Sequence, residues 1–443
     1  MTVTSTDRLT ADEILRLNRE YTFFSWSAQA KVNPIVIDRA EGIYFWDPDG
    51  KRYIDFNSQL MSVNIGHGDR RVADAISEQA NKLAFAAPQF ATEPRGRLGQ
   101  LLAELTPGDL NTFFFTLGGA EANENALRLA RIFTGRQKVI ARYRSYHGAT
   151  AGAISATGDP RRWASEPAVP GFVRVLDPQR YGNPEADPVD EHLAYLEEVI
   201  QYEGPQTIAA FILETVVGTN GILIPPDGYL QGVRELCTKH GILLIADEVM
   251  AGFGRTGRWF AVDHWGVVPD LLTMAKGLTS SYLPLGVVAM TDAIAAHFAE
   301  KVYYGGLTYS AHPVSCAAAI AAVNVLRDDD LVGNAARLGP VMASLHADLM
   351  ARHPSVGAVR NIGLFGIVEL IRNRETREPM APFNGSSPEM AALDARLKAD
   401  GLYTMQHWDG FFTNPPLCIT EEQLREAFAI IDAALEVTDA AVA

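Results

Sequence analysis

Residues 271–278 read Leu-Leu-Thr-Met-Ala-Lys-Gly-Leu, an apolar run that ends in a lysine and a glycine. Such a run predicts a buried strand of a parallel sheet. Groups that carry chemistry collect at the carboxyl ends of these strands. Lys276 is therefore expected at a strand end, partly desolvated, with a lowered pKa and a nucleophilic amine. A lysine in this position is, on its own, more often a solvated surface residue.

A second apolar run, residues 241–246, leads directly into Asp247. Enough chain separates Asp247 from Lys276 for one crossover connection, so neighbouring parallel strands would present both groups to one crevice. This pair suits pyridoxal phosphate (PLP): the lysine would form the Schiff base, and the carboxylate would keep the pyridine nitrogen protonated. The alternative for Asp247 is a helix N-cap.

A phosphorylated cofactor also needs an anion site. Residues 116–123 read Thr-Leu-Gly-Gly-Ala-Glu-Ala-Asn, after a predicted strand at 112–115 and at the start of a predicted helix at 122–133. Backbone N–H groups at a helix N-terminus bind phosphate, and Gly118, Gly119 and Ala120 carry no bulk that would keep it away. The alternative is a tight strand-to-helix turn without a ligand.

Two further residues follow predicted strands. Tyr146 comes shortly after the run 138–141, where its ring could stack on a pyridine face. Glu214 ends the run 208–213 and would place a second acid near the ring. A structural role in the core for Tyr146 and a strand cap for Glu214 remain the alternatives.

Composition frames these hypotheses. The chain has 443 residues, 47% hydrophobic and 21% charged, as in a globular protein, and exceeds the about 250–300 residues typical of a single core. A net charge of −15 argues against nucleic acid or an anionic membrane as a partner. The three cysteines have no CxxC spacing, so neither a disulfide nor a metal site is expected. Residues 1–8 lack the apolar core of a signal peptide and no apolar segment approaches the about 20 residues of a membrane span, which predicts a cytoplasmic protein.

The pattern along the chain predicts an α/β fold with three parts. Residues 1–65, with a helix at 11–21 and a hairpin around 47–50, would form an N-terminal segment that contributes to a small lobe. Residues 66–326 alternate helices and strands, which predicts a large PLP-binding domain with a mostly parallel sheet flanked by helices. Residues 327–443 predict a smaller α+β domain with helices at 331–352 and 421–437.

As a set, several motifs make the chain resemble the class III (ω-amino) aminotransferases, PLP-dependent enzymes of fold type I, over nearly its whole length. Within this family the chain is most similar to amine–pyruvate and taurine–pyruvate transaminases. The family motifs lie at residues 116–123, 146–148, 247–257, 273–277, 307–313 and 414–417.

The resemblance implies roles for the residues that match the family pattern. Lys276 would hold the cofactor as a Schiff base and shuttle the substrate proton, and Asp247 would pair with the pyridine nitrogen. Val249 and Tyr146 would pack on opposite faces of the ring, with Glu214 nearby.

The phosphate would bind the amides of Gly119 and Ala120, and Thr308 would reach the phosphate of the neighbouring subunit. The resemblance thus implies a homodimer with shared active sites, with a tetramer as an alternative. The family usually has serine in the phosphate loop, whereas Gly118 and Ala120 lack the hydroxyl. Each lost hydrogen bond costs about 1–2 kcal/mol, so weaker cofactor retention is expected.

The substrate pocket is the part in which this chain departs most from its family. Many relatives have an arginine that binds a substrate carboxylate where this chain has His407, which is a poorer anchor. Met61 stands where several amine transaminases have tryptophan, and methionine makes a more adaptable wall. With Trp26 and Phe85 as further candidate walls, the sequence predicts a pocket for primary amines larger than alanine.

The predicted function is ping-pong transfer of an amino group from a primary amine or ω-amino compound to pyruvate. A taurine-specific transaminase, an amino acid decarboxylase and an aminomutase are alternatives, because they share Lys276 and Asp247. A non-catalytic PLP-binding protein and a nucleotide-binding Rossmann enzyme rank below them, the latter because GxGxxG does not follow the first predicted strand.

Overall fold

The computed structural model describes residues 9–179 and 187–442. Its centre is a seven-stranded sheet in the order β4-β10-β9-β8-β7-β5-β6. Only β10 runs antiparallel to its neighbours, which confirms the prediction of a mostly parallel sheet. The strands are β4 (Thr112–Thr116), β5 (Lys138–Arg142), β6 (Phe172–Val175), β7 (Ile208–Glu214), β8 (Leu243–Asp247), β9 (Leu271–Met274) and β10 (Gly286–Met290).

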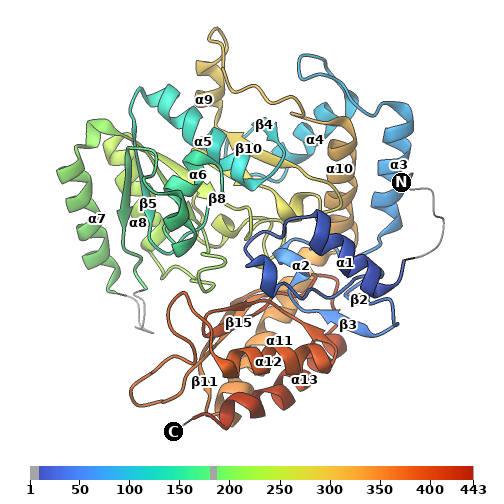
Figure 1. The fold of residues 1–443 in the computed structure, drawn as a ribbon. Helices are drawn as coiled ribbons and strands as arrows, with labels where there is room; N and C mark the ends of the chain where they lie inside the picture. Colours follow the sequence, from blue (N-terminus) through green and yellow to red (C-terminus); the bar gives the residue numbers. More distant parts are fainter. Residues whose placement is uncertain (1–8, 180–186, 443) are drawn as a thin grey trace.

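Helices cover both faces of this sheet (Figure 1). Alternate residues of β7 pack on opposite sides: Ile212 contacts the cluster that contains α5 (Gly119–Thr134), whereas Phe211 contacts the cluster of α7 (Val189–Glu203) and α8 (Tyr229–His240). A strand buried on both faces has no solvent side, which explains why these strands are continuous apolar runs. The other helices before residue 330 are α1 (Ala11–Tyr21), α2 (Ser58–Met61), α3 (Arg70–Lys82), α4 (Glu93–Ala103), α6 (Ala151–Ala156), α9 (Asp292–His297) and α10 (Pro313–Asp328).

The N-terminal hairpin and the C-terminal part of the chain share a second sheet. Strands β1 (Arg39–Glu41), β2 (Tyr44–Trp46) and β3 (Arg52–Asp55) are antiparallel neighbours, and β13 (Leu402–Tyr403) pairs with β3 in parallel. The predicted turn forms around Asp47, whose Oδ1 accepts the Lys51 N–H at 2.9 Å. The pairing of β3 with β13 joins segments that are far apart in the sequence.

A third sheet, antiparallel, lies at the bottom of Figure 1 beside the C-terminal helices. Its order is β11-β12-β15-β14. The strands are β11 (Val356–Ile362), β12 (Phe365–Leu370), β14 (Gln406–His407) and β15 (Gly410–Thr413), and the helices are α11 (Leu331–Arg352), α12 (Pro388–Ala399) and α13 (Glu421–Asp439). The predicted helices at 331–352 and 421–437 are confirmed here. The division into parts at residues 65 and 326 stays a prediction.

Arg255 joins the parts of the molecule. It is fully buried, and its guanidinium donates to the carbonyls of Leu364 (3.1 Å) and Pro415 (2.5 Å). It also donates to Ser58 Oγ (3.1 Å) and Asn64 Oδ1 (2.9 Å). Burial lowers the pKa of Arg255 to about 9. One side chain thus satisfies acceptors from the N-terminal segment and from the C-terminal part.

Among the described residues, no helix is both long enough and apolar enough to cross a membrane. Residues 1–8, on which the prediction about a signal peptide rests, lie outside the described part of the chain.

Candidate active site

A cavity of about 510 Å³ opens at the carboxyl ends of the parallel strands, next to the N-terminus of α5. Leu60, Ser62 and Thr219 form part of its wall. The cavity brings together eight of the residues singled out from the sequence: Gly118, Gly119, Ala120, Tyr146, Glu214, Asp247, Val249 and Lys276.

Asp247 is the last residue of β8, and its carboxylate is held by three neighbours. Oδ2 accepts from Asn123 Nδ2 at 2.7 Å and lies 2.8 Å from His147 Nδ1. Oδ1 accepts the Val249 N–H at 3.0 Å, and Thr273 Oγ1 donates in turn to Asn123 Oδ1 at 2.7 Å. These contacts fix the orientation of the carboxylate, which suits it to hold a charged ring nitrogen in one place.

Glu214 lies beside Asp247, because the two residues are paired in the register of β7 and β8. Its carboxyl accepts the N–H groups of Tyr146 (2.9 Å) and Gly218 (2.7 Å). Burial raises the pKa of Glu214, and the neighbouring Asp247 charge acts in the same direction. Glu214 is therefore an acid that resists ionisation next to the Asp247 carboxylate.

Ala275 separates Lys276 from the end of β9, so the lysine lies at a strand end, as predicted, and it starts the short 3-10 helix η5 (Lys276–Leu278). Burial lowers the pKa of its amine, although Asp247 and Glu214 oppose this. A lowered pKa increases the fraction of neutral amine, the form that attacks a carbonyl carbon. The backbone of Lys276 has φ of 42°, in the left-handed region that glycine favours.

The strand-to-helix turn before α5 forms the anion site. The helix begins at Gly119, three residues before the predicted start, so the amides of Gly119 and Ala120 lie in its first turn. N–H groups in a first turn have no acceptor within the helix, and they lie at the positive end of the helix dipole. A Cβ on Gly119 would come within 2.8 Å of Val249 Cγ1, so glycine lets this turn pack against the valine.

This set of donors fits PLP. The first turn of α5 would hold the phosphate, and Asp247 would face the pyridine nitrogen. The buried amine of Lys276 would meet the aldehyde carbon. Because these three groups line one cavity, a single molecule of this shape can contact all of them.

Sequence reasoning missed Arg161 at the edge of the cavity. Its guanidinium carbon lies 3.6 Å from the centre of the Tyr146 ring, and Nη2 donates to Thr219 Oγ1 at 2.7 Å. Nε donates to Asp159 at 2.8 Å. The Arg161 charge also contributes to the lowered pKa of Lys276. Arg161 belongs to the 3-10 helix η2 (Pro160–Ser165), and no strand end or glycine motif marks it in the sequence.

The five other predicted residues do not line this cavity in the single chain. Met61 is 1% exposed and packs in the core with Phe365 and Phe412, while its neighbours Leu60 and Ser62 line the cavity. His407 lines a different cavity, where burial lowers its pKa to about 4. Trp26, Phe85 and Thr308 are exposed at the surface.

Comparison with known proteins identifies the family of the chain. The family model for class III aminotransferases matches residues 26–435. The putrescine–pyruvate aminotransferase of Pseudomonas aeruginosa is 34% identical over 422 residues, which cover 92% of this chain and 91% of that protein. The taurine–pyruvate aminotransferase of Bilophila wadsworthia is 32% identical over 446 residues, with 95% and 96% covered.

A solved structure is similar over the whole chain. The taurine:2-oxoglutarate aminotransferase of Bifidobacterium kashiwanohense, in complex with PLP and glutamate, superimposes with a TM-score of 0.96 at 42% identity. The match covers 99% of this chain and 100% of that one. The chain therefore belongs to the class III aminotransferases, PLP-dependent enzymes of fold type I that act on small-molecule amines and keto acids.

Proposed function

We propose that the protein transfers an amino group from a primary amine or ω-amino compound to pyruvate, by a ping-pong mechanism. The observation that carries this proposal is the buried Lys276 amine in one cavity with Asp247, with Arg161 at the edge. The similarity to the putrescine–pyruvate and taurine–pyruvate aminotransferases supports pyruvate as the acceptor.

In the proposed reaction, Lys276 and Asp247 have different tasks beside the cofactor. PLP, when bound, supplies the aldehyde that takes up the amino group and the ring that withdraws electrons from the substrate carbon. Lys276 Nζ has a lowered pKa and takes the proton from the substrate carbon. It then returns this proton on the cofactor side of the transferred nitrogen. The Asp247 carboxylate, held in one orientation by its hydrogen bonds, stabilises positive charge on the ring nitrogen.

Arg161 replaces the missing arginine at position 407 as the anchor for an acid group. Within the described residues, Arg161 uses Nε and Nη2 for hydrogen bonds to Asp159 and Thr219, and Nη1 makes none. Tyr146 and Thr219, which both contact Arg161, line the cavity. A carboxylate or sulfonate on the substrate would therefore meet a fixed guanidinium, which binds such groups strongly.

A second candidate reaction has taurine as donor and 2-oxoglutarate as acceptor. It is favoured by the similarity to the taurine:2-oxoglutarate aminotransferase at 42% identity. Arg161 suits both taurine's sulfonate and the distal carboxylate of 2-oxoglutarate, so the two candidates share one cavity and differ in the acceptor.

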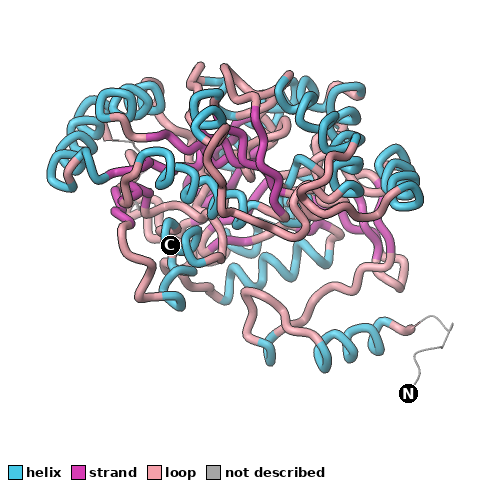
Figure 2. Tube along the Cα trace, turned by 90° about the horizontal axis from the view of Figure 1, so that it is seen from above, coloured by secondary structure: helices cyan, strands magenta, loops and turns pink. Residues whose placement is uncertain are grey.

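The active sites are proposed to form in a homodimer. Helix α1 has no buried residue and lies apart from the body of the molecule in Figure 2. Large apolar side chains are exposed nearby in sequence, Phe23 by 83% and Trp26 by 64%, and Tyr304 by 84% close to Thr308. Exposed apolar surface of this kind marks an interface. If Thr308 reaches the partner's cavity, mixing the Lys276→Ala and Thr308→Ala variants would restore part of the activity.

The visible absorption of the PLP-loaded protein tests the reaction. An amine donor should bleach the band, and pyruvate should restore it, with alanine formed in equal amount. The same experiment with taurine as donor and 2-oxoglutarate as acceptor, followed by glutamate formation, separates the two candidates. A band that bleaches with an amine but returns with neither keto acid would contradict both.

A further inference from the structure

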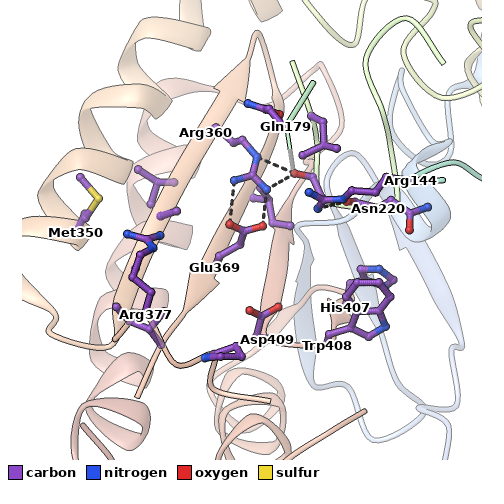
Figure 3. Close-up of a pocket in the computed structure, with 18 residues that line it drawn as sticks. Arg144, Gln179, Asn220, Met350, Arg360, Glu369, Arg377, His407, Trp408 and Asp409 are labelled. Atoms are coloured by element: carbon purple, nitrogen blue, oxygen red, sulfur yellow. Dashed lines mark hydrogen bonds and ion pairs between the residues drawn. The ribbon is translucent and has the colours of Figure 1, made fainter. Parts of the chain in front are cut away.

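A second cavity, of about 440 Å³, lies between the third sheet and the loop after β7 (Figure 3). It has no lining residue in common with the catalytic cavity. The two cavities are nevertheless neighbours, because Thr219 lines the first and Asn220 lines the second. The loop 219–222 is thus a wall between them.

Arginine side chains hold this wall from both sides. On the side of the first cavity, Arg161 Nη2 donates to Thr219 Oγ1 at 2.7 Å. On the side of the second cavity, Arg144 Nη2 donates to the carbonyl of Asn220 at 2.6 Å. Arg360 Nε donates to the carbonyls of Gly221 (2.7 Å) and Ile222 (3.1 Å). Arg144 and Arg360 converge at Gly221, where a Cβ would lie within 2.8 Å of one guanidinium and 3.1 Å of the other. Such convergence of positive charge favours an anion beside the wall.

Part of the charge in the second cavity is already paired. Arg360 and Glu369 form a two-point ion pair, with Nη1–Oε2 at 2.9 Å and Nη2–Oε1 at 2.5 Å. This pair lies in the middle of Figure 3, with Arg144 to its right and Asp409 below it. The Arg360–Glu369 pair is therefore structural, and the ligand chemistry of the cavity depends on its other charged lining residues, Arg144, Asp409 and the exposed Arg377.

Arg144 and Asp409 are not paired. Across the described residues, the Asp409 carboxylate has no hydrogen bond or ion pair to the side chain or backbone of another residue, and the Arg144 side chain donates only to the Asn220 carbonyl. Burial and the neighbouring Glu369 raise the pKa of Asp409 to about 7. Two further polar atoms of the lining, Gln179 Oε1 and His407 Nε2, are buried without a hydrogen-bond partner among the described residues. Groups of this kind are rare in folded proteins unless a ligand or water satisfies them.

We propose that this second cavity binds a small zwitterion, with its ammonium group at Asp409 and its acid group at Arg144. A diacid would place like charge against Asp409 and Glu369, and a diamine would place like charge against Arg144. The apolar part of the lining, which includes Leu223, Val359 and Ile367, suits a short aliphatic chain between the two charged groups. Amino acids have this chemistry.

Calorimetry with 4-aminobutanoate tests the proposal, with butanoate and butylamine as probes that each lack one charged group. The protein is the PLP-loaded Lys276→Ala variant, which prevents turnover. We expect two binding events per chain. Adding Asp409→Asn should weaken one event by about tenfold or more, because a charge-assisted contact is lost. Glu375→Gln, at an exposed acid two residues before the lining residue Arg377, is the matched control and should change affinity less than twofold.

The two events are assigned by a second substitution. Arg161→Gln should weaken only the event that Asp409→Asn leaves intact. The proposal is overturned if Asp409→Asn changes neither event, or if butanoate binds the second cavity as tightly as 4-aminobutanoate. Since the readout is binding, it stands even if the proposed amino-group transfer fails.

A crystal structure of the PLP-loaded wild-type enzyme with saturating 4-aminobutanoate gives an independent readout. The molecule should lie between Asp409 and Arg144. Water alone in this cavity would overturn the proposal.

Discussion

The two cavities on either side of the loop 219–222 each contain a carboxylate, but the fold treats the two acids differently. Asp247 accepts hydrogen bonds from a side-chain amide and a backbone N–H, and lies against His147. Asp409 has no hydrogen bond to another of the described residues, and burial raises its pKa to about 7. The first acid is oriented before any ligand arrives, whereas the second is left for a ligand to satisfy. Preorganisation of this kind belongs to groups that stabilise a reacting charge.

The largest effect is expected at Lys276. Lys276→Ala removes the amine that moves the substrate proton, so kcat should fall by about 10⁴-fold. The rate at which an amine bleaches the visible band measures this in a single turnover. Lys239→Ala, on the exposed side of α8, is the control. A variant that kept a substantial part of its rate would show that another base does this work.

Arg255 tests how much the contacts that join the parts of the molecule around the two cavities contribute to the free energy of unfolding. Arg255→Met leaves several buried acceptors without a donor, and we expect it to lower the free energy of unfolding by about 3–5 kcal/mol. Arg425→Met removes an exposed pair with Glu421 and should cost less than about 0.5 kcal/mol. Denaturant titration of both variants gives the difference. Equal stabilities would mean that the Arg255 contacts contribute little.

Arg161 contacts the loop 219–222 on the side of the Lys276 cavity, and its substitution tests whether it binds the acid group of a substrate. Arg161→Gln should raise KM for a substrate with an acid group by about 10–100-fold, because a charge-assisted hydrogen bond is lost. A simple alkylamine, which lacks that group, should lose much less. Arg162→Gln, whose guanidinium pairs with Glu166 instead, is the neighbouring control. An equal loss for both substrates would assign Arg161 to the scaffold.

The smallest effect concerns the pH dependence of stability at Asp409, which faces Glu369, Arg144 and Arg360. Its pKa is raised from 3.8 to about 7 in the folded state, so the folded protein binds more protons than the unfolded chain between these values. Stability from this group is therefore lost as the pH rises through that window. Asp409→Asn should raise Tm relative to wild type at pH 8 but not at pH 4. The same gain at both pH values would rule out titration of Asp409 as the cause.

The cavity that contains Lys276 and Asp247 was predictable because its residues follow strands that the sequence marks as apolar runs. Lys276 and Asp247 lie at the ends of neighbouring strands, and this needs only the rule that parallel strands share a carboxyl edge. Arg161 could not be found in this way, because it contacts the lining residues Tyr146 and Thr219 from a 3-10 helix whose position depends on the tertiary fold.

The predicted substrate walls depended on which way single side chains point. Ser58, Gln59 and Met61 have φ of 48°, 56° and 51°, and such local reversals decide which side chain faces the core. Met61 therefore points into the core, and its neighbours line the cavity. No periodic pattern in the sequence reports these angles. For the same reason the cavity around Asp409 was not predicted: it forms where loops and short strands meet.

The positive φ of Lys276 has an evolutionary consequence. A side chain in this backbone region costs about 1–2 kcal/mol compared with glycine, so the fold alone would favour glycine at position 276. A requirement for the amine would explain why the position holds a lysine. In a descendant that had lost its reaction, position 276 would be among the first to drift, and its replacement by glycine would leave a more stable protein.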